Sequence, residues 1–165
     1  MQNTAIEMTS LVDMLLQLGV ATLMVIATVL LHACGLAVLG RFLRLEARQE
    51  VTRHVPAISA RTLAFTLALV LSLFVLHGLE IWGYAFLYLS LHAVADLATA
   101  VYFSTITYAS IGFDDRYMAS DWRLVSAIEG VNGVLLLGWS TAFFVTVVTR
   151  LGGVERSGRD LRTSP

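Results

Sequence analysis

The chain has 165 residues, of which 57% are hydrophobic and 14% are charged, and its mean hydropathy is +0.75. Soluble domains carry about 25% charged residues, so this composition excludes an ordinary soluble domain and predicts a small membrane protein. The formal net charge of −1 indicates little about partners, but all eleven positive charges are arginines, and their positions are informative.

Three stretches are long and apolar enough to cross a bilayer, which takes ~20 residues in a helix. They run from about Leu11 to Leu39, from about Leu63 to Leu89 and from about Leu124 to Val148. Each is expected to be helical, because lipid offers the backbone no hydrogen-bond partner outside its own helix. The sequence therefore predicts an all-α membrane protein with three transmembrane helices.

The arginines predict the orientation of these spans. The linker between the first two spans contains Arg41, Arg44, Arg48, Arg53 and Arg61. The segment after the third span contains Arg150, Arg156, Arg159 and Arg162. Because arginine-rich loops stay in the cytoplasm, we expect both segments inside and the N-terminus outside the plasma membrane. The linker is also expected to bind anionic lipid.

A fourth stretch, from Val94 to Ile111, is only moderately apolar. Its polar residues are Asp96, Ser104, Thr105, Thr107 and Ser110. A full crossing here would place the arginine-rich C-terminal segment outside, so we expect this stretch to enter from the outside and turn back. Such a re-entrant segment is tolerated only where protein or a water-filled cavity surrounds it. The stretch therefore predicts a pore or a vestibule.

The segment VYFSTITYASIGFDD, from Val101 to Asp115, resembles the pore helix and selectivity filter of potassium channels. The filter of that family reads T-V-G-Y-G followed by Asp. The corresponding residues here are Ser110, Ile111, Gly112, Phe113, Asp114 and Asp115. The first four match by identity or close substitution, and Asp115 falls at the family's usual Asp. The order of outer helix, pore helix, filter and inner helix also agrees, from about Leu63 to Val148.

The resemblance implies an ion-binding filter made of these six residues. It also implies a homotetramer, because one chain supplies one filter segment and the family's filter is fourfold. Three regions follow from this interpretation. Residues 1–62 form a transmembrane helix and an arginine-rich cytoplasmic linker, residues 63–150 form the pore domain, and residues 151–165 form a short disordered cytoplasmic tail.

The main departure from the family is Asp114, which stands where the second filter glycine is expected. A filter replaces the hydration shell of an ion with rings of backbone carbonyls, and this needs left-handed backbone angles that glycine adopts freely. Gly112 is expected to supply one such position. In a tetramer, Asp114 and Asp115 place eight carboxylates at the outer mouth, so we expect altered selectivity among K⁺, Na⁺ and Ca²⁺. The alternative is a non-conducting structural or accessory protein.

Two polar pairs lie within the spans at similar depth, His77 with Glu80 and Glu129 with Asn132. Each pair is three residues apart and shares a helix face. In one interpretation, Glu80 or Glu129 supports the filter from behind by accepting hydrogen bonds from Thr107, Tyr108 or backbone amides. In the others, the pairs only lock helix packing, or His77, Glu80, Glu129 and His92 form a metal or enzyme site.

No paired metal-ligand spacing occurs in these spans, so we expect no metal other than permeant cations and no cofactor. The sequence also lacks a nucleophile constellation, a phosphate loop and a nucleic-acid-binding pattern. We therefore expect no enzyme activity, no organic substrate and no nucleic-acid partner. In the third span, Gly133 and Gly138 are candidates for a gating hinge, although close helix packing is the commoner use of such glycines.

Overall fold

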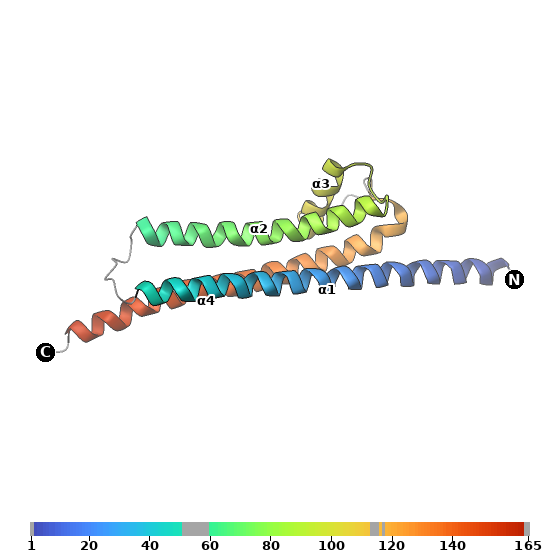
Figure 1. Cartoon of the computed structure of the whole chain (residues 1–165). Helices are drawn as coiled ribbons and strands as arrows, with labels where there is room; N and C mark the ends of the chain where they lie inside the picture. The colour runs from blue at the N-terminus through green and yellow to red at the C-terminus, as the bar shows by residue number, and fades with distance from the viewer. Residues whose placement is uncertain (1, 51–59, 113–115, 117, 164–165) are drawn as a thin grey trace. The chain divides into compact units, whose positions relative to one another are not determined.

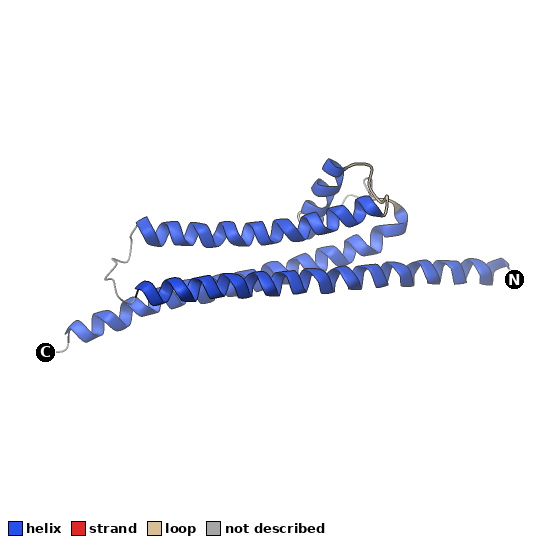
Figure 2. Cartoon of the chain, viewed as in Figure 1, coloured by secondary structure: helices blue, strands red, loops and turns tan. Residues whose placement is uncertain are grey.

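The structure is a computed structural model that describes residues 2–50, 60–112, 116 and 118–163. It contains four α-helices, labelled in Figure 1: α1 (Gln2–Glu50), α2 (Ala60–Ser90), α3 (Leu97–Tyr108) and α4 (Arg123–Thr163). A short 3-10 helix, η2 (Ser120–Trp122), precedes α4. Figure 2 shows that the described part of the chain contains no strand. The all-α prediction is therefore confirmed.

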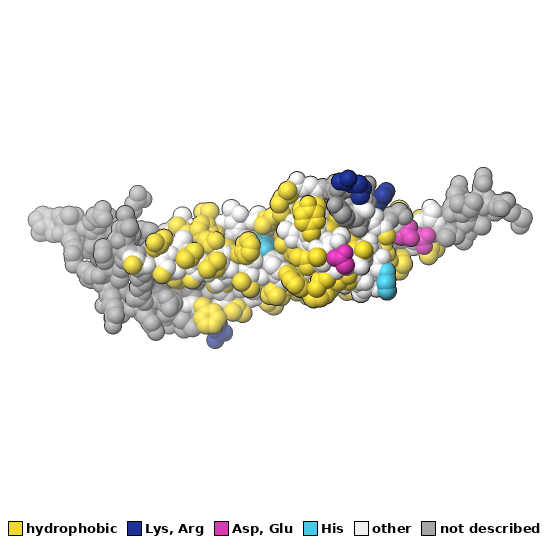
Figure 3. All heavy atoms as spheres, turned by 90° about the horizontal axis from the view of Figure 1, so that it is seen from above, with side chains coloured by type: hydrophobic (Ala, Val, Ile, Leu, Met, Phe, Trp, Pro, Cys, Tyr) yellow, Lys and Arg dark blue, Asp and Glu magenta, His cyan; other side chains and the backbone are white. Residues whose placement is uncertain are grey.

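Three of the helices contain segments that are long and apolar enough to span a membrane. These segments are Ser10–Phe42 in α1, Leu63–Ser90 in α2 and Arg123–Thr149 in α4. Large hydrophobic side chains cover much of the face seen in Figure 3, and Phe74 is 78% exposed. Such a surface is stable in contact with lipid and not in water. The protein is therefore a multi-pass membrane protein, as the sequence predicts.

The helix α4 extends beyond its membrane span to Thr163. Residues 151–163 are thus helical, and the prediction of a disordered tail over residues 151–165 is wrong for them. The physical reason lies in the sequence, because no proline occurs between Pro56 and Pro165 to interrupt the helix that leaves the bilayer.

The moderately apolar stretch from Val94 to Ile111 does not cross the bilayer. Helix α3 has 12 residues, so its length is about 18 Å, against a hydrocarbon thickness of about 30 Å. The backbone N–H of Ala119 donates a hydrogen bond to the carbonyl of Ala93 at 2.9 Å. The two ends of the intervening segment 94–118 therefore meet at the same point, as the re-entrant prediction requires.

The start of α3 is fixed by Asp96. Its carboxylate accepts hydrogen bonds from the backbone N–H of Thr99 at 2.9 Å and from the Thr99 hydroxyl at 2.8 Å. These bonds satisfy a helix N–H that has no partner within the helix. They also lower the pKa of Asp96, chiefly through the backbone N–H of Thr99, because they stabilise its charged form.

The end of α3 is a Schellman motif. The N–H of Ile111 donates to the carbonyl of Ile106 at 2.9 Å, and the N–H of Ser110 donates to the carbonyl of Thr107 at 3.0 Å. This motif requires one left-handed residue, and Ser110 supplies it with φ 53°. The expectation that Gly112 takes a left-handed conformation is wrong, because the requirement falls two residues earlier.

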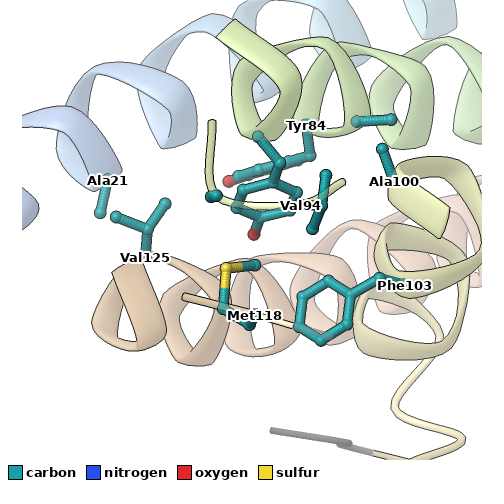
Figure 4. Packing of buried hydrophobic residues seen from close by; sticks show 10 residues of the cluster. Ala21, Tyr84, Val94, Ala100, Phe103, Met118 and Val125 are labelled. Atoms are coloured by element: carbon teal, nitrogen blue, oxygen red, sulfur yellow. The ribbon is translucent and has the colours of Figure 1, made fainter. Parts of the chain in front are cut away.

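The chain divides into two compact units, and α3 belongs to the first, which comprises Met1–His32 and His77–Leu137. Its hydrophobic core joins residues of all four α-helices, as Figure 4 shows. The labelled side chains are Ala21, Tyr84, Val94, Ala100, Phe103, Met118 and Val125. Tyr88 and Phe103 meet edge to face, with ring centroids 5.7 Å apart. This core holds α3 against α2 and α4.

The second unit comprises Ala33–Leu76 and Gly138–Pro165. Its small core contains Leu36, Leu73 and Leu76, with Phe143 and Phe144 packed against it. These two phenylalanines therefore take part in helix packing.

Replacing Asp96 with alanine is expected to weaken the first turn of α3, because the N–H of Thr99 loses its acceptor. Amide hydrogen exchange of a peptide over residues 97–100, corrected for intrinsic rates, should be faster in Asp96→Ala and nearly normal in Asp96→Asn. The folded state lowers the pKa of Asp96, so in the native protein the stabilisation is complete above its ordinary value of 3.8 and is lost as pH falls through the folded value. Equal exchange in both variants would contradict this cap.

Candidate functional site

The first buried carboxylate behind α3 is that of Glu129, on α4. It accepts a hydrogen bond from the hydroxyl of Tyr88 on α2. The hydroxyl of Ser104, on α3, lies 2.5 Å from the same carboxylate and 3.0 Å from the carbonyl of Ile81. Glu129 and Ser104 are both fully buried. Glu129 therefore joins the middle of α3 to the two helices that flank it.

The second buried carboxylate is that of Glu80, on α2. It accepts a hydrogen bond from the hydroxyl of Tyr108, the last residue of α3. Nδ1 of His32, on α1, lies 2.8 Å from Oε1 of Glu80, and Nδ1 of His77 lies 3.2 Å from Oε2. Nδ1 of His77 also lies 2.9 Å from the Tyr108 hydroxyl. The C-terminal end of α3 is therefore tied to α1 and α2.

A third polar contact joins α1, α2 and α4 without α3. The side-chain amide of Asn132 donates to the hydroxyl oxygen of Thr28 at 2.8 Å and to that of Tyr84 at 3.3 Å. Asn132, Thr28 and Tyr84 are all buried. Interhelical hydrogen bonds of this kind hold membrane helices together, because the hydrophobic effect does not drive helix association within lipid.

Two glycines let α4 approach the backbone of α3. A Cβ at Gly130 would lie 3.4 Å from the carbonyl oxygen of Thr107. A Cβ at Gly133 would collide with the carbonyl group of Tyr108, whose carbon it would meet at 2.9 Å. A Cβ at Gly138, by contrast, would meet nothing within 4 Å. Gly133 thus serves close packing, and the hinge role of Gly133 and Gly138 stays a prediction.

The predicted filter is described only in part. Ser110, Ile111 and Gly112 are exposed, and Ile111 is 75% exposed. Phe113, Asp114 and Asp115 lie outside the described residues. The hydroxyl of Thr107, in the last turn of α3, is buried and has no hydrogen-bond partner among the described atoms.

The hydrogen-bond partners of the two buried carboxylates differ in part from those that the sequence suggests. Glu80 does accept from Tyr108, whereas Glu129 accepts from Ser104 and Tyr88 and not from Thr107, Tyr108 or a backbone amide. His77 and Glu80 are joined by His32, which the sequence interpretation did not include. The signal that points to His32 is an ionisable residue in an apolar span, which by itself indicates a role inside the protein.

The metal site composed of His77, Glu80, Glu129 and His92 is not assembled. Among the described residues, the group whose possible ligand atoms converge contains His32, His77 and Glu80. His92 is exposed in the turn after α2, with φ 52°. Glu129 belongs to the separate hydrogen-bonded group described above.

Comparison with known proteins gives one match. Residues 62–150 match a protein family described as ion channel, which is more than half of the 165 residues. No curated protein matches the chain, and no solved structure matches it.

Gly133→Ala is expected to lower the free energy of unfolding by about 1–3 kcal/mol, because its methyl group collides with the backbone of Tyr108. Gly138→Ala is the matched control on the same helix and should be neutral or slightly stabilising, since alanine favours a helix and space is open there. Unfolding of both variants in mixed detergent micelles provides the measurement. Equal effects of the two substitutions would contradict the close approach.

Proposed function

The chain belongs to the ion-channel family, and we propose that it conducts cations through the centre of a homotetramer. The observation that carries the proposal is the closed path of residues 94–118, whose ends meet at the Ala93–Ala119 hydrogen bond. Within this path, the short helix α3 is held by the buried carboxylates of Glu80 and Glu129. A loop held in this way is able to present its backbone oxygens to an ion.

The polarity of α3 favours cations at this loop. The C-terminal end of a helix carries a partial negative charge of about half an elementary charge, and α3 ends at the loop that begins with Ser110. Rings of backbone carbonyls from this loop, one set from each copy, would replace the water around an ion. We propose Ser110, Ile111, Gly112, Phe113, Asp114 and Asp115 as the ion-binding residues.

One feature of the single chain supports assembly with further copies. Ile111 exposes a large apolar side chain at the turn after α3. A neighbouring copy would cover this side chain. Because each chain has one loop, fourfold assembly completes the ring.

The polar groups around α3 are proposed to keep the loop in position. Glu80 acts through Tyr108 at the C-terminal end of α3, and Glu129 acts through Ser104 one turn earlier. His77 supports Glu80 directly. The bond from Asn132 to Thr28 holds the surrounding helices together.

Asp114 is proposed to weaken selectivity for K⁺ over Na⁺. Asp114 stands where the potassium-channel filter has a glycine. The backbone conformation that forms the outermost carbonyl ring is therefore more costly. Together with Asp115, Asp114 also concentrates negative charge at the mouth, which attracts Ca²⁺ as strongly as monovalent ions or more so.

The orientation is proposed from the distribution of arginine. The N-terminus lies outside and the C-terminus lies in the cytoplasm, in the plasma membrane. The arginine-rich linker between α1 and α2 then faces anionic lipid on the inner leaflet.

Ion flux from purified protein in liposomes tests the proposal. The native protein should pass K⁺ and Na⁺ at comparable rates, while Asp114→Gly should favour K⁺ by about tenfold, which equals ~1.4 kcal/mol of discrimination. Asp13→Asn, which removes an exposed carboxylate of α1, should leave the ratio unchanged. Native mass spectrometry of the same preparation should show four copies.

Two outcomes would overturn parts of this proposal. A strong K⁺ preference in the native protein would contradict the role given to Asp114. Absence of flux together with a monomer or dimer would contradict the channel and favour the non-conducting structural or accessory protein.

A further inference from the structure

His32, His77 and Glu80 converge at one place inside the first unit. The possible ligand atoms of these three residues all lie within 4.8 Å of one another. The two imidazole rings have centroids 5.3 Å apart and approach the same carboxylate. His32 and Glu80 are fully buried, while 13% of the His77 side chain remains exposed. The group thus lies almost entirely within the protein.

The donor set matches the chemistry of a zinc-class ion. Imidazole nitrogen and carboxylate oxygen bind Zn²⁺ at about 2.0–2.2 Å, and two histidines with one glutamate leave a fourth position open. The Tyr108 oxygen lies 2.9 Å from Nδ1 of His77. We propose that His32, His77 and Glu80 bind one divalent transition-metal ion of the zinc class.

The membrane setting requires that Glu80 be compensated. A carboxylate within a span is costly unless an opposite charge or several hydrogen bonds compensate it. Tyr108 and the two imidazoles lie within hydrogen-bond distance of Glu80, and a divalent cation would give both imidazoles and the carboxylate a common partner. The competing interpretation is a metal-free hydrogen-bonded network of the same residues, and the experiment below separates the two.

No sequence motif within a single helix indicates this site, because one ligand comes from α1 and two come from α2. His77 and Glu80 lie three residues apart, but His32 precedes Glu80 by 48 residues. The sequence expectation of no resident metal was based on local spacing and did not consider α1. The first span thus contributes to a site with two residues of the second.

Metal binding would change the hydrogen bonds that fix the C-terminal end of α3. A histidine that binds the ion through Nδ1 presents its lone pair there, so its proton moves to Nε2 and the bond from Nδ1 to Glu80 is lost. Oε2 of Glu80 also accepts from Tyr108, so an ion on this oxygen competes with the Tyr108 hydroxyl. We therefore expect bound metal to loosen the C-terminal end of α3 and to lower ion flux, a consequence that rests on the proposed function.

Binding is measured on the purified full chain in detergent after dialysis against Zn²⁺. Elemental analysis should find about one zinc ion per chain in the native protein. It should find no zinc in the double variant His32→Ala/His77→Ala after the same dialysis. His92→Asn is the matched control, because it removes an exposed imidazole and asparagine tolerates positive φ. Unchanged zinc content in the double variant would overturn the site.

X-ray absorption of the zinc-loaded native protein provides a test that needs no variant. The spectrum should show two imidazoles and oxygen at about 2.0–2.2 Å from the metal. A spectrum without paired imidazole scattering, or a native protein that binds no zinc, would leave the metal-free network as the correct interpretation.

The effect on flux is tested in the same liposomes. Zinc should lower the flux of the native protein several-fold, and it should leave the double variant unchanged relative to its own zinc-free flux. Zinc binding without any change in flux would overturn the coupling through Tyr108 but not the site. Absence of flux under every condition would overturn the proposed function, and the binding data would still decide the metal site.

Discussion

The structure depends on a pairing of hydroxyl groups on a short helix with buried carboxylates on its neighbours. Helix α3 is too short to cross the bilayer and carries Ser104 and Tyr108 on its buried side. Lipid provides these hydroxyls with no partner, so the fold supplies Glu129 and Glu80. Each carboxylate in turn requires its donors, because an uncompensated buried charge costs about 3–5 kcal/mol.

Much of this arrangement was predictable from the sequence. Apolar runs of sufficient length predict the three spans, since any such run must be helical in lipid. The arginines of the first linker and of the segment after the third span argue against a fourth crossing. The polar residues of 94–111 then require surrounding protein. His77 and Glu80 were identified because ionisable residues within spans are costly, and Tyr108 was named as a partner of the carboxylates at that depth.

The remaining features depend on contacts between segments that are far apart in the sequence. His32 and Thr28 lie on α1, and the resemblance to a two-span channel gives α1 no role. Only the packing of the helices shows that His32 contacts Glu80 and that Thr28 contacts Asn132. A glycine in a helix looks the same whether it serves as a hinge or as a contact, and Gly133 is defined by the backbone opposite it. The left-handed residue follows from where α3 ends, which local patterning locates only to within a few residues.

The central claim is that residues 94–118 enter and leave the membrane on one side. Cys34 is the only cysteine of the chain, so it can be replaced by alanine and single cysteines placed at the exposed positions Ala95 and Ala119. A membrane-impermeant maleimide applied to intact cells, and then to inverted vesicles, measures the side on which each position lies. The account predicts that both positions react from the same side. Reaction of Ala95→Cys and Ala119→Cys from opposite sides would show a full crossing and would contradict it.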